Sequence, residues 1–159
     1  MRPPEPLATE LLTAPHVATL ATHDADGAIH AVAMWFRWDG DETIHLPTSG
    51  ASHKVRNARR DPRATVLVHD SRGGLDVRGL TLAGRVEVLE GEVAAAIADA
   101  VHRRYVEAPG LALPPVADFL AHDDVVLALT IERASGWDET RTEAARALRA
   151  SGAAIPPPR

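Results

Sequence analysis

One segment of the chain carries the strongest structural signal: Leu46-Pro47-Thr48-Ser49-Gly50-Ala51-Ser52-His53-Lys54-Val55-Arg56-Asn57-Ala58-Arg59-Arg60-Asp61-Pro62. Its start is typical of the end of a strand, and the small and hydroxylated residues that follow are typical of a turn. The remainder suits a helix, which must end near Asp61 because proline disfavours the helical conformation in the residue before it. The segment therefore predicts a strand, a short turn and a helix over 52–61.

The start of that helix is a candidate site for an anion. The first backbone N–H groups of a helix have no partner within the helix, and its N-terminus carries a partial positive charge. Both properties suit a phosphate group. Thr48, Ser49 and Ser52 offer hydroxyl donors, and Lys54 adds a full positive charge in the first turn.

A purely structural interpretation competes with this one. Serine is a common N-cap residue, so Ser49 or Ser52 could serve only to cap the helix. Three arginines of the helix are expected on a solvated face: Arg56, Arg59 and Arg60. At about 100° per residue, Arg56 and Arg60 lie roughly opposite Lys54, so the four charges do not form one basic patch. The local sequence leaves both interpretations open.

The composition narrows the class of protein. The chain has 159 residues, 45% of them hydrophobic and 25% charged, which suits one ordinary globular domain. A net charge of −5 with dispersed basic residues disfavours nucleic-acid binding. Without cysteine, an apolar signal core or an apolar run of about 18 residues, the chain is expected to be cytoplasmic, with no disulfide and no membrane anchor. Its eight histidines show no metal-binding spacing, so no metal is expected.

Alternation of apolar residues predicts an antiparallel sheet. Six strands are expected, over 16–22, 28–38, 42–46, 64–69, 75–90 and 124–137. The second strand has two apolar faces: Val32, Met34 and Phe36 on one, and Ala31, Ala33 and Trp35 on the other. Gly79 and Gly84 are expected to allow bends or bulges in the fifth strand, as a sheet that closes into a barrel requires.

Helices are expected outside the sheet, over 7–13, 52–61, 91–107, 116–121 and 139–150. The helix 91–107 has one apolar face, made of Val93, Ile97, Val101 and Tyr105. The predicted fold class is mainly β with peripheral helices, in a six-stranded antiparallel barrel of Greek-key type. It forms a single domain over 1–159, with a core over about 7–138 and a disordered tail over 151–159.

With this order of elements, the chain resembles the FMN-binding split-barrel superfamily, the pyridoxamine-phosphate-oxidase-like proteins. Within it, the sequence is most similar to the actinobacterial branch that uses the deazaflavin coenzyme F420. The segments that carry the resemblance are Ala18-Thr19-Leu20-Ala21-Thr22, Asp26-Gly27, Val32-Ala33-Met34-Trp35-Phe36, Thr48-Ser49, the run 52–64, Gly84-Arg85-Val86 and Gly136-Trp137. The most specific of them is the lysine-valine-arginine-asparagine run before Asp61-Pro62.

The resemblance implies a homodimer of split β-barrels with two cofactor sites in clefts at the subunit interface. The family's phosphate-binding positions fall on Thr48, Ser49, Ser52 and Lys54, and His53 stands where relatives carry a second basic residue. The flavin-like ring is expected to lie along Val32, Ala33, Met34 and Trp35. Arg78 falls at a position where relatives reach the cofactor of the partner subunit. The C-terminal substrate motif of the pyridoxamine-phosphate oxidases is absent, which argues against vitamin B6 oxidation.

The resemblance implies an oxidoreductase that transfers a hydride between F420 and a small organic acceptor. Two alternatives stay open: an FMN-dependent enzyme of the same type, and a split barrel that binds a flavin or haem without turnover. A polyglutamyl tail on F420 would favour a basic patch, to which Arg56, Arg59 or Arg60 could contribute. No residue stands out as a catalytic acid or base.

Overall fold

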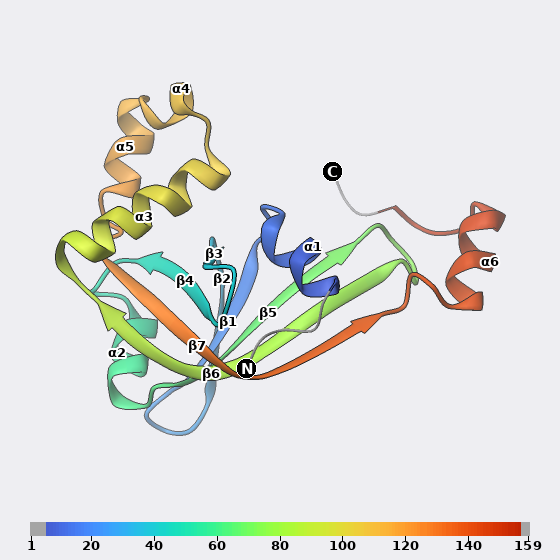
Figure 1. The fold of residues 1–159 in the computed structure, drawn as a ribbon, viewed down its shortest axis with the longest axis horizontal. Helices are drawn as coiled ribbons and strands as arrows, with labels where there is room; N and C mark the ends of the chain where they lie inside the picture. Colours follow the sequence, from blue (N-terminus) through green and yellow to red (C-terminus); the bar gives the residue numbers. More distant parts are fainter. Residues whose placement is uncertain (1–5, 157–159) are drawn as a thin grey trace.

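An antiparallel sheet forms the body of the protein, and helices lie around it (Figure 1). The computed structural model describes residues 6–156. The strands are β1 (Ala18–His23), β2 (Ile29–Met34), β3 (Arg37–Trp38), β4 (Thr43–Thr48), β5 (Arg63–Ser71), β6 (Val77–Leu89) and β7 (Val125–Asp138). The helices are α1 (Leu7–Thr13), α2 (His53–Arg60), α3 (Gly91–Tyr105), α4 (Ala108–Leu111), α5 (Pro114–Leu120) and α6 (Glu143–Ser151). The prediction of a mainly β fold with peripheral helices is confirmed.

Strand pairing brings the two edges of the sheet together. Within residues 6–156 the sheet has seven strands in the order β2-β1-β5-β6-β7-β4-β3, and every pair is antiparallel. The edge strands β2 and β3 are consecutive in the chain, separated only by Trp35 and Phe36. A connection this short spans at most about 11 Å. The sheet is therefore a half-barrel whose open edges meet at these two residues.

The number of strands is a correction to the sequence prediction of six. The predicted strand 28–38 is two strands because the chain leaves one edge of the sheet and joins the other at Trp35 and Phe36. The hydroxyl of Tyr105 accepts a hydrogen bond from the Phe36 N–H at 3.2 Å and donates one to the His16 carbonyl oxygen at 2.6 Å. Burial raises the pKa of the Tyr105 hydroxyl, so it stays protonated and able to donate.

The core lies inside the curved sheet, and α1 contributes three buried side chains to it. Leu80 and Leu82 of β6 are fully buried there, as is Leu127 of β7, in agreement with the predicted alternation. The opposite face of β7 is buried as well, because α3 covers it and packs against Val126. The sheet is thus covered on both faces at the end that carries α3.

The buried face of α3 agrees with the predicted one at Val101, which is fully buried, and at the partly buried Ile97 and Tyr105, but it differs at Val93. The prediction placed Val93 in the apolar row, but this side chain is 61% exposed. The side chains that α3 buries are Ala94, Ala98, Val101 and His102. Ala94 and Ala98 pack against Val126 of β7, with Ile97 partly buried beside them, so close packing centres the buried face on the alanines and leaves Val93 outside it.

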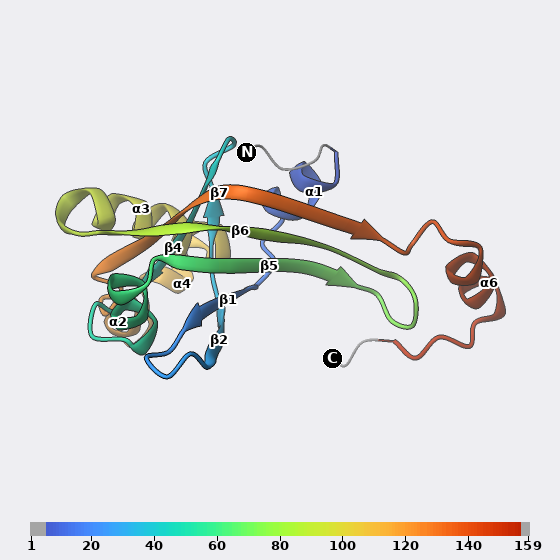
Figure 2. The same cartoon turned by 90° about the horizontal axis from the view of Figure 1, so that it is seen from below.

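Figure 2 shows β5, β6 and β7 side by side, running from the end that carries α2 and α3 to the end that carries α6. α6 starts later than the predicted position 139, because the Thr142 hydroxyl accepts from the Ala145 N–H at 3.1 Å and caps the helix there. In the predicted tail 151–159, the Ile155 carbonyl lies beside Gly73, and residues 157–159 lie outside the described part. Disorder of the tail stays a prediction.

Gly84 marks an irregularity in the long pairing of β6 with β7. The register shifts between Ala83 and Gly84, so Glu132 has no partner across the ladder. A β-carbon at Gly84 would lie 1.9 Å from the carbonyl oxygen of Thr130, which is a backbone atom. The bulge expected at Gly84 is confirmed, and glycine is required because the two backbones approach so closely.

Replacing Gly84 should therefore destabilise the sheet. We expect Gly84→Ala to lower the free energy of unfolding by about 3 kcal/mol, because the added methyl group collides with backbone that cannot move alone. Urea denaturation followed by circular dichroism measures the loss.

The matched control is Gly136→Ala in β7. There the added β-carbon would meet the end of the Leu7 side chain at 2.9 Å, which can rotate away. A loss at Gly136 as large as that at Gly84 would contradict the role given to the bulge.

Candidate functional site

A cleft of about 350 Å³ opens where β2, β4, α2 and α5 meet. Its lining residues come from segments far apart in the sequence: Ala33, Met34, Trp35, Pro47, Thr48, Lys54, Phe119, Leu120 and Asp123. In Figure 1, β4, α2 and α5 lie toward the same end of the molecule, away from α6. Five of the residues predicted to bind a cofactor therefore line one cleft.

The turn between β4 and α2 forms the polar end of the cleft. β4 is paired with β7 as far as Thr48, which lies opposite Val125. The chain then turns, with the Ser52 N–H donating to the Ser49 carbonyl at 3.0 Å. The Gly50 N–H donates to the Asp124 carboxylate at 2.6 Å, which ties the turn to the segment that follows α5. The start of α2 is thus held in place from both sides.

Polar groups at the start of α2 lack partners. Ser52 occupies the N-cap position by its backbone, but its hydroxyl makes no capping bond and is buried with no hydrogen-bond partner among residues 6–156. The first hydrogen bond of the helix runs from the Arg56 N–H to the Ser52 carbonyl oxygen at 3.2 Å. The backbone N–H groups of the first turn, which precede Arg56, therefore have no acceptor within the helix. Simple capping by Ser52, the structural alternative, does not explain this arrangement.

Lys54 supplies the positive charge in the cleft. With the other residues of 6–156, its ammonium group makes no hydrogen bond and no ion pair shorter than 4.0 Å. Burial lowers the pKa of Lys54, and the nearby negative charge of Asp123 partly opposes this effect. Lys54 lies in the first turn of a helix whose leading N–H groups and N-cap hydroxyl have no partner in the described part of the chain, and this combination fits a phosphate, which would supply the missing acceptors.

Trp35 forms the aromatic wall of the cleft. Its ring stacks on that of Tyr105 with a centroid distance of 4.9 Å and an angle of 3°, and it meets the His102 ring edge-on at 6.4 Å. Since the Tyr105 hydroxyl holds the backbone at Phe36, the same residue fixes both the closure of the sheet and the Trp35 ring. A flat, partly apolar group fits against such a wall.

The helix α5, which the sequence predicted over 116–121, and the turn after it complete the cleft. Sequence reasoning found the helix but did not assign it to the site. Leu120 is buried, whereas Phe119 is 75% exposed at the edge of the cleft. Asp123 follows, and its Oδ2 lies 2.9 Å from Nε2 of the buried His102. The available signal was the pair of aspartates after a short helix, which carries no information on the distant segments that it meets.

Other predicted site residues lie outside the cleft lining. Val32 packs partly buried against the core, and Ser49 lies in the turn with its hydroxyl 3.4 Å from the Ala51 N–H. His53 points to the β1–β2 turn, where it pairs with Asp24 at 3.0 Å. Arg78 lies on β6 and forms ion pairs with Glu10 and Asp70. Whether these four bind a cofactor stays a prediction.

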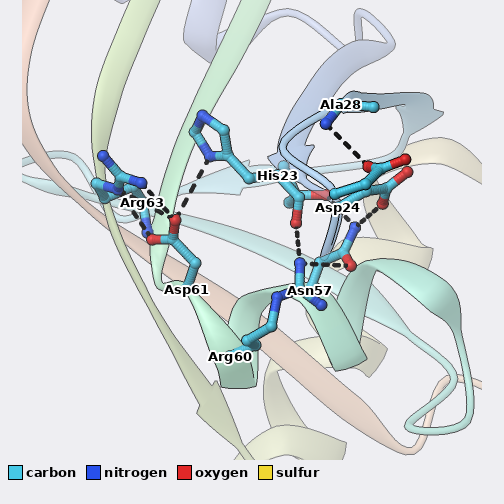
Figure 3. A network of polar contacts seen from close by, with 9 residues as sticks. His23, Asp24, Ala28, Asn57, Arg60, Asp61 and Arg63 are labelled. Carbon is cyan, nitrogen blue, oxygen red and sulfur yellow. Dashed lines mark hydrogen bonds and ion pairs between the residues drawn. The ribbon is translucent and has the colours of Figure 1, made fainter.

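A polar network fixes the position of α2 against the β1–β2 turn (Figure 3). The side-chain N–H₂ of the buried Asn57 donates to Thr22 Oγ1 at 3.1 Å and to Asp24 Oδ1 at 2.6 Å. Arg60 donates to Asn57 Oδ1 at 3.2 Å and to the His23 carbonyl oxygen. The Asn57 hydrogen bond is the main reason why the pKa of Asp24 lies below its usual value. Asn57 therefore positions the helix that carries Lys54.

The helix arginines are engaged within the chain. Arg59 pairs with Glu90 at 2.5 Å, and Arg56 donates to the Ala51 carbonyl oxygen at 2.7 Å. Together with Arg60 in the Asn57 network, they do not line the cleft. Across residues 6–156, no three His, Asp or Glu side chains are grouped so as to hold a metal ion. No helix in that same range is long and apolar enough to cross a membrane.

Comparison with known proteins assigns the fold and the family. Residues 5–138 match the family described as pyridoxamine 5'-phosphate oxidase. Because the match covers most of the 159 residues, the chain belongs to this family of split-barrel proteins, which bind flavins and include oxidoreductases. The resemblance inferred from the sequence is confirmed. No curated protein matches the chain.

Solved structures agree with this assignment. The conserved hypothetical protein Rv2991 from Mycobacterium tuberculosis is 30% identical, with a TM-score of 0.72 over 86% of this chain and 85% of that protein. A protein described as an F420 reductase is 29% identical, with a TM-score of 0.67 over 83% of this chain and 98% of that protein. An FAD-binding protein from Mesorhizobium loti, at 22% identity and a TM-score of 0.61 over 81% of this chain and 90% of that protein, shares the fold.

The Asn57 network gives a prediction about stability. We expect Asn57→Ala to lower the free energy of unfolding by about 2 kcal/mol, because it removes a buried amide and leaves the Thr22 hydroxyl without its donor. Arg59→Ala on the same helix removes only a surface ion pair and should cost less than about 1 kcal/mol. Equal losses in urea denaturation of the two variants would show that Asn57 does not anchor the helix.

Proposed function

We propose that this protein is an F420-dependent oxidoreductase that transfers a hydride between the deazaflavin and a small organic acceptor. Membership of the family and the likeness to an F420 reductase at 29% identity support the chemistry. The single observation that carries the proposal is the cleft itself, in which a partly buried ammonium group without a hydrogen bond or close ion pair and an aromatic wall face the same space. A cofactor with a phosphate at one end and a flat ring at the other has this chemical pattern.

Each part of the cleft has a role in this proposal. Lys54, the Thr48 hydroxyl and the N–H groups at the start of α2 would hold the phosphate, with the orphaned Ser52 hydroxyl beside them. The ring would lie along Ala33, Met34 and Trp35. When bound, the deazaflavin supplies the hydride, and the protein binds, orients and shields it. The apolar side chains of α5 would exclude water from the reacting edge.

We further propose that the working unit is a homodimer in the cytoplasm, bound neither to nucleic acid nor to a membrane. On the edge strand β2, Ala31 and Ala33 are exposed. A groove lies on the paired strands β6 and β7, where Thr81, Ala83 and Ser135 line it. A second copy that covers this face would complete the half-barrel. In such a dimer, Arg78 is the residue proposed to approach the partner's cofactor.

FMN is the second candidate cofactor, because it also joins a phosphate to a three-ring system. If FMN is the cofactor, the same residues have the same roles. A split barrel that binds either compound without turnover is the third candidate. Steady-state reduction of an acceptor separates the third candidate from the first two.

Titration of the purified protein with F420 and, separately, with FMN tests the proposal directly. Quenching of the cofactor's fluorescence reports binding. We expect F420 to bind at least about ten times more tightly than FMN, a difference of about 1.4 kcal/mol. Tighter binding of FMN than of F420 would identify FMN as the cofactor. Binding of neither compound would refute the proposal.

Removal of the charge at Lys54 tests the phosphate site. We expect Lys54→Ala to raise the dissociation constant for F420 by about ten- to a hundredfold, as loss of a charge-assisted hydrogen bond does. Arg103→Ala on α3 is the matched control, since it removes one positive charge from a surface ion pair with Asp99 outside the cleft and should leave the affinity unchanged. An unchanged affinity in Lys54→Ala would mean that the phosphate binds elsewhere.

A further inference from the structure

A fixed negative charge lies in the same cleft as Lys54. Asp123 is one of the lining residues, and its carboxylate is close enough to Lys54 to influence that residue's pKa. Neither family membership nor the proposed hydride transfer calls for an acidic group at this position. A carboxylate that faces an anion-binding lysine weakens anion binding, so its presence needs an explanation.

Asp123 is held in place by contacts on both sides of its turn. Its Oδ2 lies 2.9 Å from Nε2 of His102, which is only 9% exposed. The His102 ring is in turn packed edge-on against Trp35. On the other side, the neighbouring Asp124 accepts from the Gly50 N–H at 2.6 Å. The contact with His102 and the anchoring of the neighbouring Asp124 therefore fix the position of the Asp123 carboxylate in the cleft.

The charges that this chain contributes to the cleft lining sum to about zero. Among the lining residues, Lys54 is the only cation and Asp123 the only anion, and the other seven are uncharged. A phosphate monoester carries a charge near −2 at neutral pH, because its second pKa is about 6. A phosphate diester has no second proton to lose and carries −1. Among the lining residues of this chain, the second negative charge of a monoester would meet Asp123 without a second cation to balance it.

We propose that Asp123, positioned by His102, selects phosphodiester ligands over phosphomonoester ligands in this cleft. This inference rests on the proposed function, because it assigns the cleft to a phosphate-bearing cofactor, and it adds a reason for the choice between the two candidates. The phosphate of F420 is a diester that links the ribityl chain to a lactyl group, whereas that of FMN is a monoester. Lys54 attracts both, and Asp123 penalises the dianion more than the monoanion.

The test uses two probes that differ by one charge and one methyl group: FMN and its methyl ester, in which the phosphate is a diester. Both are titrated into the full-length wild-type protein and into Asp123→Asn, with flavin fluorescence as the readout at pH 8. We expect the wild type to bind the methyl ester about five to ten times more tightly than FMN. In Asp123→Asn, FMN should gain about five- to tenfold in affinity and the preference should disappear.

Asp118→Asn is the matched control, because it removes the same charge from an exposed position on α5 outside the cleft. It should leave the preference for the ester unchanged. His102→Gln is a second variant, which loosens the carboxylate while keeping it in the chain. It should reduce the preference without abolishing binding of the ester.

The outcomes separate the two proposals. Equal affinities of the two probes for the wild type, or an unchanged ratio in Asp123→Asn, would overturn the selection role of Asp123 and leave the cofactor site standing. Failure of FMN, its ester and F420 alike to bind the wild type would overturn both the proposed function and this inference.

Discussion

The rest of the structure depends on one hydrogen bond, which joins the Tyr105 hydroxyl to the backbone at Phe36. At Phe36 the chain passes from one edge of the sheet to the other, and the Tyr105 hydroxyl accepts from its N–H at 3.2 Å. The Tyr105 ring also supports Trp35 by stacking at 4.9 Å. One side chain of α3 therefore connects closure of the half-barrel to the wall of the cleft. The fold and the site share this constraint, since any change in how the edges meet would move Trp35.

The other end of the cleft depends on where α2 begins. Asn57 anchors the helix to the β1–β2 turn, and Asp124 ties the preceding turn to the segment after α5. Lys54 lines the cleft and Ser52 caps the same helix by its backbone, and within residues 6–156 neither side chain has the hydrogen-bond partners that buried polar groups normally have. Such unsatisfied groups cost stability in the free protein, and a bound phosphate would remove that cost.

Local signals in the sequence predicted part of one side of the cleft. Thr48 and Lys54 followed from a strand, a turn and a helix that adjoin in the chain, whereas Trp35 became a candidate only through the family resemblance. The strand break at Trp35 was missed because it depends on Tyr105, which lies 69 residues beyond Phe36. Phe119 and Asp123 were missed for the same reason, since their place in the cleft depends on packing across the fold. The face of α3 was wrong at Val93 because close packing of alanines outweighed hydrophobicity.

The central claim is that the cleft between Trp35 and Lys54 binds a phosphate-bearing, flat-ringed cofactor. A crystal structure of the protein soaked with F420 tests it most directly. The account predicts the phosphate within hydrogen-bonding distance of the Lys54 ammonium group and Thr48 hydroxyl, and the ring along Ala33 to Trp35. A bound cofactor whose phosphate lies away from Lys54, with the ring outside this cleft, would contradict it.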